Sequence, residues 1–218
     1  KINTTKKIVI AKKDSNVIEK PYDSLIIATG AKPSIPPIDN IMEEGKLLNG
    51  VFVLRTIDDA KDISLSATNG NNATIIGAGL IGLELAESLY KKEMKITVVE
   101  ALPSILANTL DEDMSKIIFD EISKKVEILT DHIATKIESN SGEITKVFVK
   151  DNKTGEEMDI QTDLLVIAAG LKPDTALARD AGCKLNEKGY IIVNNKCETS
   201  VKDVYAIGDC TEFKDFIT

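Results

Sequence analysis

The sequence has no tryptophan, one histidine and few aromatic residues, which make up 4% of its 218 positions. Its three cysteines, Cys183, Cys197 and Cys210, form no Cys-x-x-Cys pair. Neither a disulfide framework nor a zinc site is therefore indicated, and no metal ligand set is expected. We expect free thiols in a reducing cytoplasm, packed among other side chains.

Long apolar runs and excess positive charge are also missing. No stretch approaches the roughly 18 apolar residues that a membrane span requires, and the first residues lack the apolar segment of a signal peptide. The net charge of −8 disfavours nucleic acid and anionic membrane surfaces as partners. These features predict a cytoplasmic protein with one large domain or two small ones.

The apolar pattern predicts an α/β fold, with strands and helices separated by polar turns. Two runs, 25–28 and 164–168, are apolar throughout, as in strands buried on both faces. The segment AKPSIPPIDN contains three prolines, which exclude helix and central strand and favour a linker. Helices are expected to begin at Thr56 and to cover 80–92 and 111–125, the last with Met114, Ile117, Ile118 and Ile122 on one face. Further strands are expected at 6–11, 17–19, 51–54, 73–76, 96–99, 126–129, 133–138, 144–150, 157–161, 190–193 and 204–207.

The stretch IIGAGLIGLELAE, residues 75–87, matches the pattern Gly-x-Gly-x-x-Gly between an expected strand and an expected helix. Gly77 allows a tight turn, Gly79 lets the backbone approach a pyrophosphate, and Gly82 lets helix and strand pack closely. The N–H groups at the start of the helix, near Ala78, Leu80 and Ile81, favour an anion. This βαβ unit predicts a dinucleotide site.

Glu100 closes the next strand, 18 residues after Gly82, where a carboxylate would accept the ribose hydroxyls of the adenosine. A carboxylate repels a 2′-phosphate, and the following Ala101-Leu102-Pro103 offers no Arg or Lys to pair with one. The site should therefore prefer NAD(H) to NADP(H). FAD or S-adenosylmethionine could use a similar turn and acid, so this unit alone leaves the ligand open.

Two other stretches resemble each other, LIIATGAKP at 25–33 and LVIAAGLKPD at 165–174. Each is an apolar strand, a small-small-Gly turn and a Lys-Pro pair, which lets a backbone approach another group closely. In VYAIGDC, Asp209 follows a strand and Gly208, a place from which a carboxylate can accept a cofactor hydroxyl. As an isolated signal, that Gly-Asp pair is an ordinary turn.

Taken together and in this order, these stretches resemble the FAD-dependent pyridine nucleotide–disulfide oxidoreductase superfamily, most of all its NADH oxidase, coenzyme A-disulfide reductase and rubredoxin reductase branch. In that family an NAD-binding domain is inserted into an FAD-binding domain. The resemblance implies a Rossmann-like, doubly wound NAD(P)-binding domain with an antiparallel meander at 49–169, and two strips of an FAD-binding domain at 1–48 and 170–218.

The resemblance also implies roles for individual residues. Glu84 and Gly170 would line the nicotinamide side of the NAD(H) site, and Asp209 would contact the ribityl or pyrophosphate part of FAD. The implied positions are Gly77, Ala78, Gly79, Leu80, Ile81, Gly82, Glu84, Glu100 and Gly170 for NAD(H), with Ala28, Thr29, Gly30 and Asp209 for FAD.

The implied activity is hydride transfer from NADH to FAD and onward to oxygen, a disulfide or a small redox protein, in a homodimer. Hydride transfer needs no side chain as acid or base, so no catalytic residue is predicted. His132 is interpreted as a surface or loop residue. The three cysteines match none of the family's redox-active motif.

The chain also departs from the family. No Gly-x-Gly-x-x-Gly precedes Gly77, and both ends, at Lys1 and after DCTEFKDFIT, are expected to be cuts in a longer protein. Alone, the chain is expected to be inactive, because half of the FAD site would be absent. A nucleotide-binding module without turnover is therefore an alternative function. A Rossmann methyltransferase is a weaker one, since it leaves the paired Gly-Lys-Pro turns unexplained.

Overall fold

The computed structural model describes residues 1–212 and divides into two units. The central unit is Pro33–Gly170, and the terminal unit joins Lys1–Lys32 to Leu171–Thr218. The first division therefore lies before Pro33 and not near residue 48, because Ile38, Ile41 and Leu48 are buried in a core of the central unit. The second division, after Gly170, lies beside the expected boundary. Within the described residues, no helix is long and apolar enough to cross a membrane.

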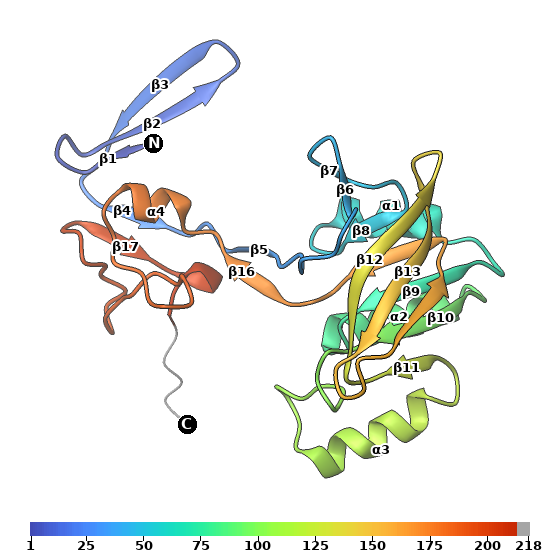
Figure 1. The fold of residues 1–218 in the computed structure, drawn as a ribbon. Helices are drawn as coiled ribbons and strands as arrows, with labels where there is room; N and C mark the ends of the chain where they lie inside the picture. The colour runs from blue at the N-terminus through green and yellow to red at the C-terminus, as the bar shows by residue number, and fades with distance from the viewer. Residues whose placement is uncertain (213–218) are drawn as a thin grey trace. The chain divides into compact units, whose positions relative to one another are not determined.

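A five-stranded parallel sheet organises the central unit (Figure 1). Helices separate its first four strands along the chain, and the meander precedes the fifth, so the α/β class expected from the pattern is confirmed. Val98 and Leu164 at its centre are fully buried, and for Leu164 the continuous apolar run at 164–168 predicts this burial. In spatial order the strands are β11 (Glu127–Leu129), β10 (Lys95–Val99), β9 (Asn72–Ile76), β15 (Leu164–Ile167) and β8 (Val51–Val53).

The two faces of this sheet contact different layers. Along β15, Leu164 and Val166 face a core shared with the helices, whereas Leu165 and Ile167 face a core shared with the meander. Side chains that alternate in this way require cover on both faces of the sheet. The helical layer is α1 (Ile57–Ser66), α2 (Leu80–Tyr90) and α3 (Glu112–Ile122).

The predicted packing face of α3 is partly wrong. Met114 and Ile117 are 49% and 59% exposed, whereas Ile118 and Ile122 pack against the core as expected. Ser115, rather than Met114 or Ile117, faces inward. It is 1% exposed, and its hydroxyl donates to the carbonyl of Ile105 at 2.6 Å. A satisfied hydroxyl can therefore take an inward position that hydrophobicity alone assigns to a larger side chain.

An antiparallel meander covers the second face of the sheet, as the turn pattern predicts. Its buried positions Ile137, Val147 and Val149 pack with Ile76 and Val99 of the sheet. A small hairpin belongs to the same unit. The meander is β12 (His132–Asn140), β13 (Glu143–Asp151) and β14 (Glu157–Gln161), and the hairpin is β6 (Met42–Glu43) and β7 (Lys46–Leu47).

The terminal unit is built from short strands around a small core that includes Ile27, Ile191, Ala206 and Cys210. The hairpin expected near the N-terminus is confirmed, as is the strand before Gly208. Three expectations for this unit are wrong. The elements are β1 (Ile2–Asn3), β2 (Ile8–Lys13), β3 (Asn16–Pro21), β4 (Leu25–Ile27), α4 (Ala176–Asp180), β17 (Val204–Ala206) and a 3₁₀ turn, η1 (Gly208–Cys210).

Strand β4 is not buried on both faces. Ile27 packs into the core, but Ile26 is 61% exposed, because the described part of this unit supplies no layer over that side. The strand expected at 190–193 is replaced by isolated bridges, in which Ile191 pairs with Leu185 and Thr211. Cys183 and Cys210 are buried as expected, whereas Cys197 is exposed at a turn with φ +60°. Its alternation with apolar residues was therefore misleading.

The two similar Gly-Lys-Pro stretches pair with each other as β5 (Ala31–Pro33) and β16 (Leu171–Pro173). The N–H of Asp174 donates to the carbonyl of Gly30, and the N–H of Ser34 donates to that of Gly170, both at 2.9 Å. Residue numbers rise on one strand as they fall on the other, so the pair is antiparallel. A two-stranded ribbon accepts proline at its edges, which explains a strand in the proline-rich segment.

Candidate functional site

The turn between β9 and α2 has a glycine where the backbone requires one. Gly77 has φ +107°, and its N–H donates to the carbonyl of Val99 at 2.8 Å. A Cβ atom built on Gly77 would lie 2.5 Å from the carbonyl oxygen of Ala168. Both the positive φ and this close approach to the neighbouring strand exclude a side chain. The chain's own packing therefore explains Gly77.

Gly82 is explained in the same way. A Cβ atom there would overlap the carbonyl oxygen of Gly77 and would lie 3.5 Å from the Cβ of Ala168. The first turn of α2 therefore sits directly against the end of β9. This close packing directs the N-terminus of the helix at the space beyond the carboxyl ends of the parallel strands.

Gly79 has no such explanation within the described chain. It caps α2 with φ −79° and ψ −176°, an ordinary extended conformation, and no atom lies within 4 Å of a Cβ built on it. It is also exposed, and no side chain caps the helix. The first N–H groups of α2, which have no partner inside the helix, therefore face open space at the positive end of the helix dipole.

Glu100 follows β10 and lies beside this turn. Its Oε2 accepts from the N–H of Ala78 at 2.7 Å, and its Oε1 accepts from the N–H of Leu102 at 2.8 Å. The side chain is half-buried. Each carboxylate oxygen has two lone pairs, so both oxygens can still accept a hydroxyl from a ligand. The bond to Ala78 was not foreseen, because a spacing of 22 residues carries no signal for it.

The remaining positions predicted for the central unit surround the turn. Leu80 and Ile81 begin α2 and are 58% and 47% exposed, which is unusual for large apolar side chains at the start of a well-packed helix. Glu84 lies one helical turn after Leu80 and is exposed. Gly170, with φ +85°, follows β15, the strand next to β9. The structure therefore brings Gly77–Gly82, Glu100 and Gly170 to one edge of the sheet.

In the terminal unit, the positions after β4 lead into β5, the strand that pairs with β16. The hydroxyl of Thr29 donates to the carbonyl of Asp174 at 2.5 Å, and Gly30 has φ +65°. Ala28 is exposed. Asp209 is exposed in η1, directly after β17. Because β4 and β17 are parallel neighbours, the segments that follow both strands leave the same edge of this small sheet.

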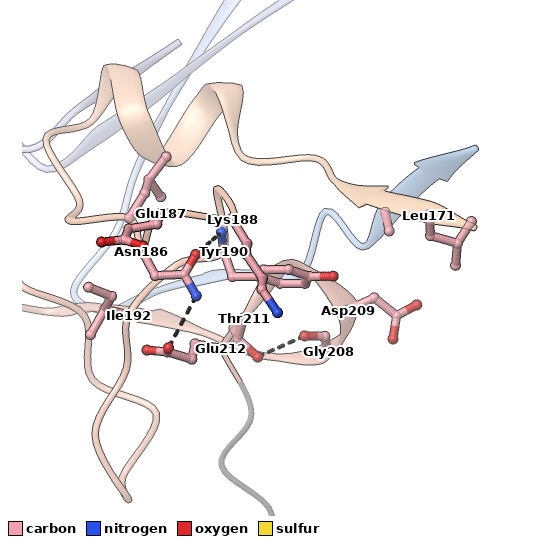
Figure 2. Close-up of a pocket in the computed structure, with 12 residues that line it drawn as sticks. Leu171, Asn186, Glu187, Lys188, Tyr190, Ile192, Gly208, Asp209, Thr211 and Glu212 are labelled. Atoms are coloured by element: carbon pink, nitrogen blue, oxygen red, sulfur yellow. Dashed lines mark hydrogen bonds between the residues drawn. The ribbon is translucent and has the colours of Figure 1, made fainter. Parts of the chain in front are cut away.

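Asp209 and Gly208 line an open cavity of about 1230 Å³ in the terminal unit (Figure 2). Asn186, Lys188 and Tyr190 line it as well, and sequence reasoning did not select them. Asn186 organises this wall: its Oδ1 accepts from the N–H of Tyr190 at 2.9 Å. Its Nδ2 donates to Glu212 at 3.1 Å. The turn sequence NEKGY was the available signal, but by itself it indicates only a loop.

His132 lies nearer the candidate site than its sequence position suggested. Its Nδ1 is 2.6 Å from the carbonyl oxygen of Thr130, and its backbone N–H donates to the carbonyl of Glu100 at 2.9 Å. The imidazole is thus engaged with its own strand junction. It is half-buried and forms the first residue of strand β12, so the interpretation of His132 as a surface or loop residue is wrong.

Comparisons with known proteins show the family of the chain. The family model described as pyridine nucleotide-disulphide oxidoreductase matches residues 1–217, and the chain belongs to that family. It is 40% identical over 215 residues to an NADH oxidase of Methanocaldococcus jannaschii, covering 97% of this chain and 45% of that protein. It is 33% identical to an NAD(P)H sulfur oxidoreductase (CoA-dependent) of Pyrococcus abyssi, covering 92% of this chain and 43% of that protein.

Solved structures also match the fold of the chain. The structure of reduced Bacillus anthracis CoADR-RHD matches with a TM-score of 0.88 and 33% identity, covering 100% of this chain and 38% of that one. A NAD-dependent persulfide reductase from A. fulgidus matches with a TM-score of 0.85 and 33% identity, covering 96% and 37%. The chain spans less than half the length of these relatives. The comparisons therefore show its family and its Rossmann-like α/β fold.

Proposed function

We propose that the turn Gly77–Gly82 binds the pyrophosphate of NAD(H). Gly79 is the observation that carries this proposal, because neither its backbone conformation nor any neighbouring atom requires a glycine there. A glycine that leaves room for an external group, in front of uncapped N–H groups, is what a pyrophosphate needs. The donors are backbone groups, so sequence changes elsewhere on α2 leave them in place.

Glu100 sets the preference for NADH over NADPH in this proposal. Its two carboxylate oxygens lie beside the turn and keep free lone pairs for the adenosine ribose. A 2′-phosphate at the same place would meet a negative charge, and the exposed Ala101 and Leu102 beside it offer no cation. On the nicotinamide side, Glu84 and Gly170 would line the site, next to the exposed Leu80 and Ile81.

The terminal unit would supply part of an FAD site. The cavity beside Asp209 is open and combines charged, amide and aromatic side chains, which fits a polar ribityl and pyrophosphate chain. Asp209 would accept a hydroxyl there, and Ala28, Thr29 and Gly30 would form the adjoining edge. When bound, FAD would supply the redox chemistry, while the residues of this chain bind and orient the two cofactors.

The whole protein is then an FAD-dependent NAD(P)H oxidoreductase that passes hydride from NADH to FAD. Oxygen, a disulfide or a small redox protein would be the final acceptor. The names of the relatives include an NADH oxidase and a CoA-dependent sulfur oxidoreductase, and one related structure is a putidaredoxin reductase–putidaredoxin complex, 27% identical to this chain. We also propose a cytoplasmic homodimer that binds no nucleic acid.

An anaerobic reduction experiment tests this function. The full-length protein, purified with FAD, is mixed with NADH or NADPH, and the visible flavin absorbance is followed in time. NADH should bleach the flavin at a lower half-saturating concentration than NADPH. Gly79→Ala should raise that concentration for both nucleotides. Bound flavin that NADH leaves oxidised would contradict the proposal.

A further inference from the structure

The loop after β10, residues 100–102, is hydrogen-bonded to the junction between β11 and β12. The carbonyl of Glu100 accepts from the N–H of His132 at 2.9 Å. The carbonyl of Leu102 accepts from the N–H of Asp131 at 3.0 Å. Both donors belong to the junction between β11 and β12, so the two ends of the loop are fixed by backbone groups that most substitutions leave in place.

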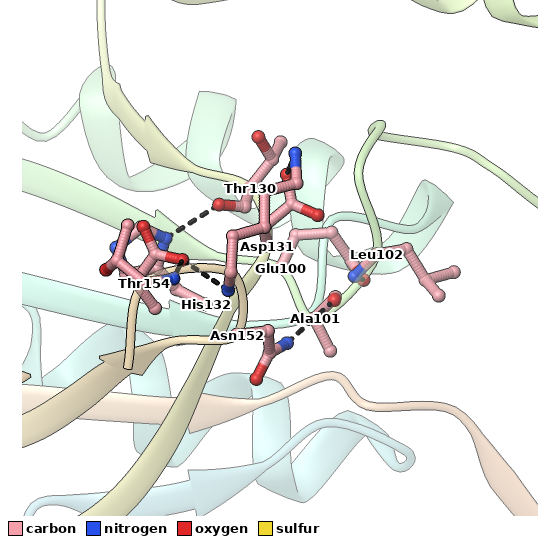
Figure 3. Close-up of polar contacts among 10 residues, drawn as sticks. Glu100, Ala101, Leu102, Thr130, Asp131, His132, Asn152 and Thr154 are labelled. Atoms are coloured by element: carbon pink, nitrogen blue, oxygen red, sulfur yellow. Dashed lines mark hydrogen bonds and ion pairs between the residues drawn. The ribbon is translucent and has the colours of Figure 1, made fainter. Parts of the chain in front are cut away.

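The middle carbonyl, that of Ala101, is held by a side chain. Nδ2 of Asn152 donates to it at 3.2 Å, and Figure 3 shows the Asn152 amide directed at this oxygen. Asn152 lies in the turn between β13 and β14, and its own N–H donates to the carbonyl of Asp131 at 2.7 Å. One residue therefore connects the tip of the meander with both the loop and the junction that supports it.

The turn that presents Asn152 is itself well ordered by polar contacts. Asp151 Oδ1 accepts from the N–H groups of Lys153 at 2.6 Å and Thr154 at 3.1 Å, and these bonds lower the pKa of Asp151. Nζ of Lys153 lies 2.7 Å from Oδ2 of Asp131, whose side chain is only 17% exposed. The ion pair draws the turn onto the junction and keeps the Asn152 amide within reach of the loop.

Leu102 links this support to the candidate nucleotide site. Its carbonyl accepts from Asp131, while its N–H donates to Oε1 of Glu100. The other oxygen of Glu100 accepts from Ala78 in the glycine turn. A loop free to move at Ala101 would shift the Leu102 N–H, and with it the carboxylate that faces the glycine turn.

We propose that Asn152 is a positioning residue for nucleotide selection, which fixes Ala101 and thereby the Glu100 carboxylate that discriminates NADH from NADPH. The inference rests on the proposed NAD(H) site. Asn152 lies outside that site and acts through the loop. A residue with this role changes the ratio of the two affinities, whereas a residue that only supports folding lowers both affinities and the stability together.

The test compares Asn152→Ala and Asn152→Leu with a matched control, Asn140→Ala. Leu has nearly the shape of Asn without the N–H donor and adds no charge, so it cannot hold a carbonyl and does not alter the local charge. Asn140 ends β12 on an exposed part of the meander, and its amide oxygen accepts only from Ser141 Oγ, at 3.3 Å, among the described residues. Affinities for NADH and NADPH are measured by calorimetry, and thermal unfolding is measured in parallel.

Both Asn152 variants should weaken NADH binding by about twofold to fivefold, the effect of one exposed hydrogen bond, and should change NADPH binding less. Asn140→Ala should leave both affinities unchanged. A constant NADPH-to-NADH ratio in the Asn152 variants would overturn the positioning role while leaving the proposed site intact. If the unsubstituted protein binds no NADH, the proposed function fails and the inference falls with it.

Hydrogen exchange without nucleotide gives a second, independent readout. The amide of Leu102, which donates to Glu100, should exchange faster in Asn152→Ala than in the unsubstituted protein. In Asn140→Ala it should exchange at the original rate. Unchanged exchange at Leu102 in Asn152→Ala would overturn the coupling between the β13–β14 turn and the loop at 100–102, whatever the nucleotide affinities are.

Discussion

The carboxylate of Glu100 accepts a hydrogen bond from the backbone N–H of Ala78 at 2.7 Å. This bond joins the end of β10 to the glycine turn that follows β9. Glu100 therefore has a role in shaping the turn in addition to the role we propose for it with the ribose. The two roles have different consequences, and substitutions can separate them.

Glu100→Gln should separate charge from hydrogen bonding. Gln keeps one acceptor oxygen for Ala78 or Leu102 but removes the negative charge. The ratio of the NADPH affinity to the NADH affinity should rise by about tenfold or more over that of the unsubstituted protein, since the repulsion of a 2′-phosphate is lost. Calorimetric titration with both nucleotides measures the ratio. An unchanged ratio would mean that the carboxylate does not face the 2′ position.

Gly79→Ala should weaken nucleotide binding without unfolding the protein. The φ of −79° and the open space around Gly79 accommodate a Cβ, so the cost in stability should be at most about 1 kcal/mol, the preference of a helix cap for Gly over Ala. NADH affinity should fall by about tenfold or more, because the added methyl group stands where the pyrophosphate approaches.

Gly82→Ala is the matched comparison for that variant. Its Cβ would overlap the carbonyl oxygen of Gly77, so it should lower the free energy of unfolding by about 1–3 kcal/mol. Urea unfolding at one temperature compares the two variants. Equal losses of stability would contradict the distinction between a glycine required by packing and one that leaves room for a ligand.

The packing between α2 and the sheet predicts a large difference between two leucines. Leu89 in α2 is 2% exposed and belongs to the core, whereas Leu65 in α1 is 83% exposed. Leu89→Ala should cost about 2–5 kcal/mol of unfolding free energy through lost burial and a cavity. Leu65→Ala should change it by about 0.5 kcal/mol or less. Similar losses for both would show that α2 is not packed as described.

The N-terminus of α1 predicts a stability change with pH. Thr56 and Asp59 form a reciprocal cap: Asp59 N–H donates to Thr56 Oγ1 at 3.1 Å, and Thr56 N–H donates to Asp59 Oδ2 at 2.7 Å. The hydrogen bonds from the Thr56 backbone, its hydroxyl and the Arg55 backbone lower the pKa of Asp59 below its ordinary value of 3.8. Stabilisation by the charged cap is therefore complete above that value and is lost as the pH falls through the lowered pKa.

Asp59→Ala should consequently destabilise the protein by about 1 kcal/mol at pH 7, and by less as the pH falls below about 4. Asp58→Ala is the control, because it removes the same charge from the same helical turn without removing a capping bond. Denaturant unfolding at a series of pH values gives both curves. A difference between Asp59→Ala and the unsubstituted protein that grows on acidification would have the wrong sign.

Asp209→Ala tests the proposed flavin site in the full-length protein. The side chain is exposed at the edge of the cavity, so its removal should leave the thermal unfolding midpoint nearly unchanged. The flavin content per protein after dialysis should fall, while NADH binding at the glycine turn should be kept. Full flavin retention would remove Asp209 from the site.

Much of the central unit could be predicted because its signals are local. A continuous apolar run identified β15, and the βαβ pattern around the glycine spacing placed β9, β10 and the turn that leads into α2. The failures had causes outside the local pattern. Ser115 is buried where the carbonyl of Ile105 offers it an acceptor, while Met114 is exposed. The periodicity of the helix predicts neither the burial of Ser115 nor the exposure of Met114.

In the terminal unit, the wrong predictions concern covering layers and pairing partners, which the sequence of a single strand does not indicate. The run at 25–28 has the composition of a doubly buried strand, yet Ile26 is exposed because no layer covers it in the described chain. Residues 190–193 alternate like a strand but find only isolated bridges. The residues proposed for the central unit come from the glycine pattern and the family resemblance, and the structure brings Gly77–Gly82, Glu100 and Gly170 to one edge of the sheet. The contacts of Glu100 with Ala78 and of Asn152 with Ala101 depend on tertiary packing, which has no sequence signature.

The most direct test of the central claim is a calorimetric titration of the purified protein with NADH, NADPH, FAD and S-adenosylmethionine in parallel, repeated with Gly79→Ala. We predict saturable binding of NADH, weaker binding of NADPH, no binding of S-adenosylmethionine, and loss of NADH affinity in the variant. Absence of NADH binding, or preferential binding of S-adenosylmethionine, would contradict the assignment of the glycine turn to NAD(H).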